Sequence, residues 1–112
     1  MTRHEEKEYM YKILEAYQVE DGKVYDPTYD CLFTMDQAKR SIDIFIELAD
    51  LREDESIIDF VENKIYTMPI EYQADLAIKT TDMLHDEKII NDDIYRKALA
   101  NISMYKKLHA CQ

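Results

Sequence analysis

The sequence TMDQAKRSIDIFIELADL, at positions 34–51, decides the fold that this chain is expected to adopt. A capping box marks its start, because the Thr34 side chain can accept a hydrogen bond from the backbone N–H of Gln37 while Gln37 reaches back to the N–H of Thr34. On a helix of about 100° per residue, apolar side chains then cover more than half of the circumference. They are Met35, Ala38, Ile42, Ile44, Phe45, Ile46, Leu48, Ala49 and Leu51. Such a helix contacts neighbours on several sides, so we predict that residues 34–51 are the central helix of a small bundle.

The composition favours helices in a single domain. The chain has 112 residues, of which 46% are hydrophobic, enough for one modest core. One glycine and two prolines are too few for a turn-rich all-β domain. We therefore predict an all-α fold, a compact bundle of four to five helices, in one helical domain that spans residues 1–112.

One helix is expected before the central helix in the sequence, and one is expected after it. The first begins at Thr2, which can form a second capping box with Glu5. Its predicted buried face is Tyr9, Met10, Ile13, Leu14 and Tyr17. The other follows Asp54 and Glu55, because acidic residues are favourable at a helix N-terminus. It is predicted to bury Ile57, Ile58, Val61, Ile65 and Met68, and Phe60 lies off this face.

The C-terminal third of the chain predicts two more helices. Pro69 suits the first turn of a helix that runs to about Asp86. Its apolar face is Ile70, Ala74, Ala77, Ile78, Thr81 and Leu84. Asn91 is a suitable N-cap for the last helix, since Asp92 and Asp93 follow it. That helix is predicted to bury Ile94, Tyr95, Ala98, Leu99, Ile102, Tyr105 and Leu108.

The segment VEDGKVYDPTYDCLF, at positions 19–33, interrupts the helical pattern. Asp21 and Gly22 both tolerate positive φ, so they can form the turn of a short β-hairpin near residues 18–25. Alternatively, Gly22 ends the first helix and the segment is an irregular loop. Pro27 excludes a helix here in either case. The apolar side chains of the segment indicate that it packs against the domain; they are Tyr25, Tyr29, Leu32 and Phe33.

The charge of the chain restricts its partners. Its formal net charge is −10, from 14 basic and 24 acidic residues. Direct binding to nucleic acid or to an anionic membrane is not expected, because both need a basic surface. Cys31 and Cys111 are isolated and predict neither a disulfide framework nor a zinc site. With no apolar span and no signal-peptide pattern, we expect a cytoplasmic protein.

Acidic residues are concentrated in one part of the chain. Eight lie between positions 43 and 62, opposed only by Arg52: Asp43, Glu47, Asp50, Glu53, Asp54, Glu55, Asp59 and Glu62. A surface of one sign attracts a basic partner and speeds the encounter. The sequence thus predicts a non-catalytic regulator or inhibitor that binds a basic protein surface, with carboxylates in the place of nucleic-acid phosphates. Such a protein would suit a phage or mobile element. The alternative is that these acids only keep the chain in solution.

Two pairs of carboxylates suggest an alternative, enzymatic function. Glu5 and Glu8, and likewise Glu47 and Asp50, are three residues apart and share a helical face. On facing helices, such pairs can hold Mg²⁺ and thereby bind the phosphates of a nucleotide. The pattern resembles that of the all-α nucleotide pyrophosphohydrolases of the MazG type, in these four residues alone. The interval between the pairs is longer here, and Ile46, not a basic residue, precedes Glu47. The resemblance implies a Mg²⁺-dependent nucleotide hydrolase in which the four carboxylates converge.

Tyrosine is unusually frequent, with nine residues and no tryptophan. Tyr11, Tyr66 and Tyr72 fall off the predicted buried faces or near helix ends. Because tyrosine is favoured at protein interfaces, these three are candidates for a binding face or a homodimer contact.

Overall fold

The computed structural model describes residues 1–110, so Cys111 lies outside the described part of the chain. Within residues 1–110 there are five α-helices, one 3₁₀ helix and a three-stranded antiparallel sheet. In chain order the elements are α1 (Arg3–Ala16), β1 (Gln18–Glu20), β2 (Lys23–Asp26), β3 (Cys31–Phe33), α2 (Met35–Ala49), α3 (Ile57–Glu62), η1 (Lys64–Thr67), α4 (Ile70–Asp86) and α5 (Asp92–Ala110). The protein is therefore mostly helical, and the all-α prediction is incomplete for residues 18–33.

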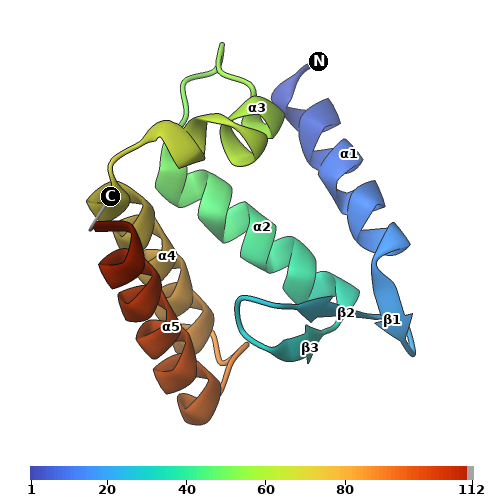
Figure 1. Ribbon diagram of the computed structural model, residues 1–112. Helices are drawn as coiled ribbons and strands as arrows, with labels where there is room; N and C mark the ends of the chain where they lie inside the picture. The colour runs from blue at the N-terminus through green and yellow to red at the C-terminus, as the bar shows by residue number, and fades with distance from the viewer. Residues whose placement is uncertain (111–112) are drawn as a thin grey trace.

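Helix α2 runs diagonally across the molecule in Figure 1. The antiparallel pair α4 and α5 lies along one side of α2, and α1 stands on the other side. The sheet contacts α2 through β2 and β3 near the start of that helix, while α3 lies near its end and contacts α1. This arrangement places α1, α2, α3 and the sheet around one region of the molecule, where the candidate site lies.

Helix starts follow the signals in the sequence. The backbone N–H of Gln37 donates to Thr34 Oγ1 (3.1 Å), and the N–H of Thr34 donates to Gln37 Oε1 (3.0 Å). Thr2 and Glu5 form the same reciprocal pair at the start of α1. Asn91 caps α5, since its Oδ1 accepts from the N–H of Ile94 (2.9 Å). These three predictions are confirmed, because a cap depends only on residues close in sequence.

Residues 18–33 form a small sheet instead of an irregular loop. Asp21 and Gly22 have φ values of 47° and 73°, the positive values that a two-residue hairpin turn requires. Glu20 pairs with Lys23 across this turn, which confirms the predicted hairpin. The third strand, β3, was not predicted; its Phe33 pairs with Val24 of β2.

The largest group of buried side chains lies between the sheet, α2, α4 and α5. It includes Val24, Phe33, Ile44, Leu84 and Ala98. Tyr29, from the turn before β3, is also buried and exchanges a hydrogen bond with Thr81 of α4 (3.1 Å between oxygens). The segment 19–33 is thus packed against the domain, as its apolar side chains indicate, although the side chains of Tyr25 and Leu32 are exposed.

The region after α2 differs from the prediction. The predicted helix over 54–68 begins only at Ile57, with Ser56 as its N-cap, and ends at Glu62; a separate turn of 3₁₀ helix follows. Phe60, expected off the buried face, is 1% exposed and packs with Ala49 and Leu76. Ile57 and Phe60 are buried, while Ile58 and Val61 are half-buried on the side that faces α1. This short helix is therefore covered on two sides, which a single apolar stripe could not describe.

Candidate functional site

Helix α1 is attached to the rest of the domain largely by polar contacts. Glu6, only 5% exposed, accepts hydrogen bonds from Ser56 Oγ (2.7 Å) and from the backbone N–H of Ile58 (3.1 Å). Although burial acts to raise its pKa, these bonds prevail and lower the pKa of Glu6 below its ordinary value. Its carboxylate is therefore a charged acceptor at the N-terminus of α3, where the helix dipole favours negative charge.

Further polar contacts join α1 to α2. Arg3 Nη2 donates to the carbonyl oxygen of Arg52 (2.6 Å), beyond the C-terminus of α2, where a cation is favourable. The Tyr11 hydroxyl donates to the carboxylate of Asp43, and Lys7 Nζ lies 3.8 Å from the same group. Burial and the bond to Asp43 raise the pKa of Tyr11 to about 12. Tyr11 is therefore half-buried, with its hydroxyl bound within the domain, and its role at a binding face stays a prediction.

The apolar face of α1 is not a buried face, contrary to the prediction. Tyr9 is 46% exposed and Ile13 is 37% exposed, while Tyr17 is exposed still further. Glu6 is the one residue of α1 that is fully buried. The sequence pattern identified an amphipathic helix correctly, but the elements opposite α1 leave this face partly uncovered. Tyr105 and Leu108 of α5 were also predicted to be buried, and both are exposed.

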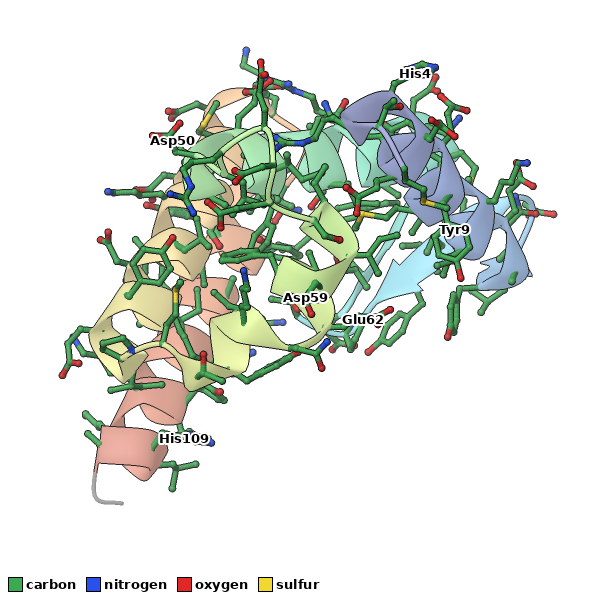
Figure 2. The ribbon with its side chains drawn as sticks, turned by 90° about the horizontal axis from the view of Figure 1, so that it is seen from above. His4, Tyr9, Asp50, Asp59, Glu62 and His109 are labelled. Atoms are coloured by element: carbon green, nitrogen blue, oxygen red, sulfur yellow. The ribbon has the colours of Figure 1, made fainter. Side chains whose placement is uncertain are left out.

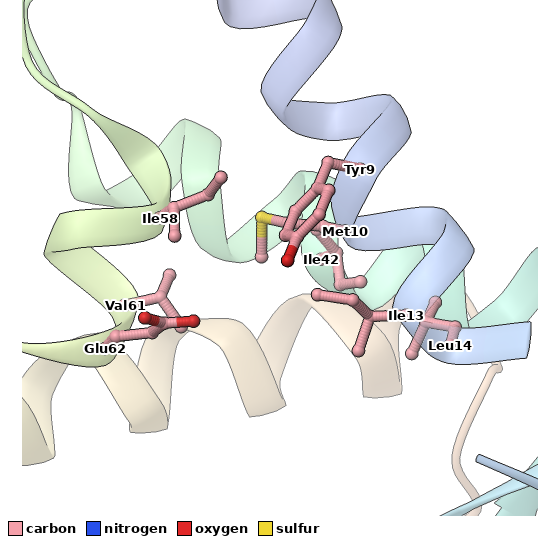
Figure 3. A pocket seen from close by; sticks show the side chains of 8 residues that line it. All are labelled: Tyr9, Met10, Ile13, Leu14, Ile42, Ile58, Val61 and Glu62. Carbon is pink, nitrogen blue, oxygen red and sulfur yellow. The ribbon is translucent and has the colours of Figure 1, made fainter. Parts of the chain in front are cut away.

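An apolar groove lies against this face of α1. Its first hollow, of about 210 Å³, is lined by Tyr9, Met10, Ile13, Leu14, Ile42, Ile58, Val61 and Glu62. Figure 3 shows the α1 side chains on one wall and the three α3 side chains on the opposite wall, and Ile42 of α2 also lines the hollow. The carboxylate of Glu62 is the one acidic group in this lining, and it points across the groove in Figure 3.

The groove continues towards the sheet. A second hollow, of about 490 Å³, shares Leu14 and Ile42 with the first. Its other lining residues include Tyr17, Val24 and Phe33, so the sheet extends the apolar surface beyond the end of α1. We use the name apolar groove for these two hollows together. Most residues that line it were predicted to lie in the core. The tyrosines at positions 9 and 17 are the signal that could have indicated a surface role, because tyrosine is favoured at interfaces.

An acidic hollow of about 430 Å³ adjoins the apolar groove. It shares Ile58 and Glu62 with the first hollow. Its acidic lining consists of Glu6, Glu53, Asp54, Glu55, Asp59 and Glu62. Figure 2 shows Asp59 and Glu62 on α3, and Tyr9 on α1 lines the first hollow together with Glu62. Five of the eight acidic residues singled out in the sequence therefore border one concave surface.

The other three of these acids lie elsewhere. Asp43 bonds to Tyr11, and Glu47 lies 3.8 Å from Arg40. Asp50 is the C-cap of α2, in the left-handed conformation (φ 50°), and lies well away from Asp59 in Figure 2. These three residues do not line the acidic hollow, whose acids come from α3, from the turn before it and from Glu6 of α1.

Ion pairs offset part of the acidic charge. Arg52 Nε lies 3.6 Å from Asp54 Oδ1 and 3.2 Å from Glu55 Oε1. Lys64 Nζ lies 4.0 Å from Asp59 Oδ2. The backbone N–H of Arg52 also lowers the pKa of Glu55, so this group is held in its charged form. Exposed ion pairs of this kind contribute little free energy and exchange easily for a partner's cations. Glu53 and Glu62 form no ion pair within residues 1–110.

The carboxylates of the enzymatic alternative are not assembled into a metal site. Among the described residues, no three His, Cys, Asp or Glu side chains lie close enough to hold a metal ion. Glu5 instead accepts from the N–H of Thr2 in the α1 capping box, and Glu47 lies near Arg40. Glu8 and Asp50, the other two carboxylates of the pattern, contribute neither to the Glu5–Thr2 hydrogen bond nor to the Glu47–Arg40 contact.

Comparison of the chain with protein-family models, with curated proteins and with solved structures finds no match in any of the three. Among the helices of residues 1–110, none combines the length and the apolar character needed to cross a lipid bilayer.

Proposed function

We propose that this chain is a non-catalytic regulator or inhibitor that binds a basic surface of a protein partner through the acidic residues of α3 and the turn before it. Its carboxylates would occupy the positions that phosphates occupy when the partner binds nucleic acid. The partner is a protein, and neither a nucleic acid nor a membrane is proposed as a ligand. The cytoplasm is the compartment in which we expect this interaction.

The observation that supports this proposal is the acidic hollow. Glu53, Asp54, Glu55, Asp59 and Glu62 border one concavity, and the net charge of the chain is −10. A concave surface of one sign raises the local concentration of a basic partner and increases its association rate. The acidic face is limited to five of the eight residues, since Asp43, Glu47 and Asp50 lie apart from it.

The proposal also treats α2 as the helix around which the domain is organised. Ile44 is fully buried, and α2 contacts α1, α4, β2 and β3. Helix α3 also packs against α2, with the ring centroids of Phe45 and Phe60 6.1 Å apart, so α2 supports both walls of the binding surface.

Charge reversal tests the proposed binding face. We expect the triple substitution Asp54→Lys, Asp59→Lys and Glu62→Lys to abolish capture of protein partners from a cytoplasmic lysate. The measurement is quantitative mass spectrometry of captured proteins at about 0.05 M and about 0.5 M salt, because screening weakens contacts between exposed charges. Partners held by this face are captured by the unsubstituted protein at low salt and released at high salt.

A matched control variant distinguishes the loss of this acidic face from the change in the net charge of the chain. Glu71, Asp75 and Asp86 are exposed residues of α4, and their reversal to Lys changes the net charge by the same amount. This control variant should retain its partners. If both triple variants lose them equally, or if neither does, the proposed face is wrong.

A further inference from the structure

We propose that the apolar groove binds an amphipathic helix of the partner, with the apolar side of that helix in the groove and its basic side against the acidic hollow. This inference rests on the proposed function and specifies the chemistry of the partner. It assigns a binding role to residues of α1 that the sequence placed in the core.

The shape of the groove suits a helix. The two hollows, of about 210 and 490 Å³, share Leu14 and Ile42, so the apolar surface extends from the space between α1 and α3 to the sheet. An amphipathic helix places its apolar side chains in a row at positions i, i+3, i+4 and i+7, which suits an extended groove.

The charges around the groove define the other side of that helix. The charged side chains that line the three hollows are all acidic: Glu6, Asp26, Glu53, Asp54, Glu55, Asp59 and Glu62. No lysine or arginine of residues 1–110 lines any of the three. Glu62 belongs both to the apolar groove and to the acidic hollow, so it marks where the apolar side of a bound helix gives way to its basic side.

The same charges argue against a second copy of this chain as the occupant. Each copy carries a formal charge of −10. Pairing two grooves would bring two acidic margins together, and like charges at an interface oppose association. A basic helix gains from the same margin, so the occupant of the groove is a different protein.

The test uses a defined peptide and the 112-residue chain. The probe is a Leu/Lys peptide of about 18 residues, or five helical turns, with leucines at i, i+3, i+4 and i+7. One control peptide has the same composition in scrambled order, so that its charge is unchanged and its apolar row is lost. A second replaces each lysine by glutamate. We expect the amphipathic basic peptide to bind at least about tenfold more tightly than either control.

Two matched pairs of substitutions locate the binding surface. Ile13 in the groove and Ile78 on α4 are almost equally exposed, at 37% and 36%. We expect Ile13→Asn to weaken peptide binding about tenfold or more and Ile78→Asn to leave it unchanged. Tyr9→Ser, with Tyr66→Ser as its control, repeats the comparison should Ile13→Asn fail to fold. Asparagine and serine are neutral, so neither pair alters the net charge.

The outcomes distinguish this inference from the proposed function. Equal binding by Ile13→Asn and Ile78→Asn, with loss in the triple acid reversal, would overturn the groove proposal and leave the acidic-face function in place. Loss in Ile13→Asn with no effect of the acid reversal would support the groove and contradict the acidic-face function. Equal binding of the scrambled peptide would overturn the groove proposal. So would a dimer in sedimentation analysis that Ile13→Asn dissociates, because a second copy would then occupy the groove.

Discussion

Substitution of Ile44 by Asp is expected to abolish cooperative folding. Ile44 has no exposed surface and packs in the main group of buried side chains, near Phe33 and Leu84. An uncompensated carboxylate at this position would have to be buried in its charged form or protonated, at a cost of several kcal/mol. Since whole domains are stable by only about 5–15 kcal/mol, this single change is comparable with the total free energy of unfolding. Thermal unfolding monitored by circular dichroism provides the measurement.

Two controls separate burial from composition. Ile78→Asp introduces the same group at a partly exposed position of α4 and should leave a cooperative transition near the original midpoint. Ile44→Val removes one methylene and should cost about 0.5–1.5 kcal/mol. A cooperative transition for Ile44→Asp at the original midpoint would show that α2 does not organise the core.

The signals that predicted helices correctly are local. Thr2 and Thr34 each cap a helix as the Glu or Gln three residues later suggests, and Asn91 caps α5 as the following Asp92 and Asp93 suggest. Pro69 precedes α4, and this helix ends at Asp86 as predicted. Each of these features depends on hydrogen bonds and backbone preferences within one turn, which the sequence contains in full.

Burial was predicted less well, because it depends on elements that are distant in sequence. In α2 the apolar arc is so wide that periodicity could not rank its members: Ile44 is fully buried, whereas Ile42 lines the groove. In α1 the apolar face is genuine, but whether another element covers it is a property of the tertiary arrangement. The same limit applies to Leu76 of α4, which is buried although it was not assigned to the apolar face.

The candidate site was partly predictable for a related reason. Glu53, Asp54 and Glu55 are adjacent in sequence, and Asp59 and Glu62 follow within two turns, so their proximity could be inferred. Asp43, Glu47 and Asp50 belong to a helix with a different orientation, and the left-handed Asp50 directs the chain away from it. The adjoining apolar groove has walls from α1, α3 and the sheet, which no local pattern brings together.

Substitution of Glu6 by Ala is the second change expected to have a large effect. It removes the acceptor for Ser56 Oγ and for the N–H of Ile58, and it leaves these two donors without a partner. Each hydrogen bond to a charged group contributes about 1.5–3 kcal/mol. We expect Glu6→Ala to lower the free energy of unfolding by about 3 kcal/mol, or the melting midpoint by roughly 10–15 °C. Glu8→Ala, at an exposed position of the same helix, should have little effect.

The contribution of Glu6 should depend on pH with a defined sign. Hydrogen bonds in the folded state prevail over burial and lower the pKa of Glu6 below its ordinary value of 4.5. The folded protein then binds fewer protons at this group than the unfolded chain does at the same pH. Its stabilising contribution is therefore fully present above pH 4.5 and is lost as the pH falls through the lower pKa of the folded state.

Glu6→Gln isolates this effect, because glutamine keeps an acceptor oxygen and cannot ionise in this range. The stability difference between the unsubstituted protein and Glu6→Gln should be largest near neutral pH and should shrink as the pH is lowered towards about 3. Urea unfolding at a series of pH values measures this difference, and the Glu8→Gln pair provides its baseline. A difference that is constant with pH would mean that the charge of Glu6 does not stabilise the contact between α1 and α3.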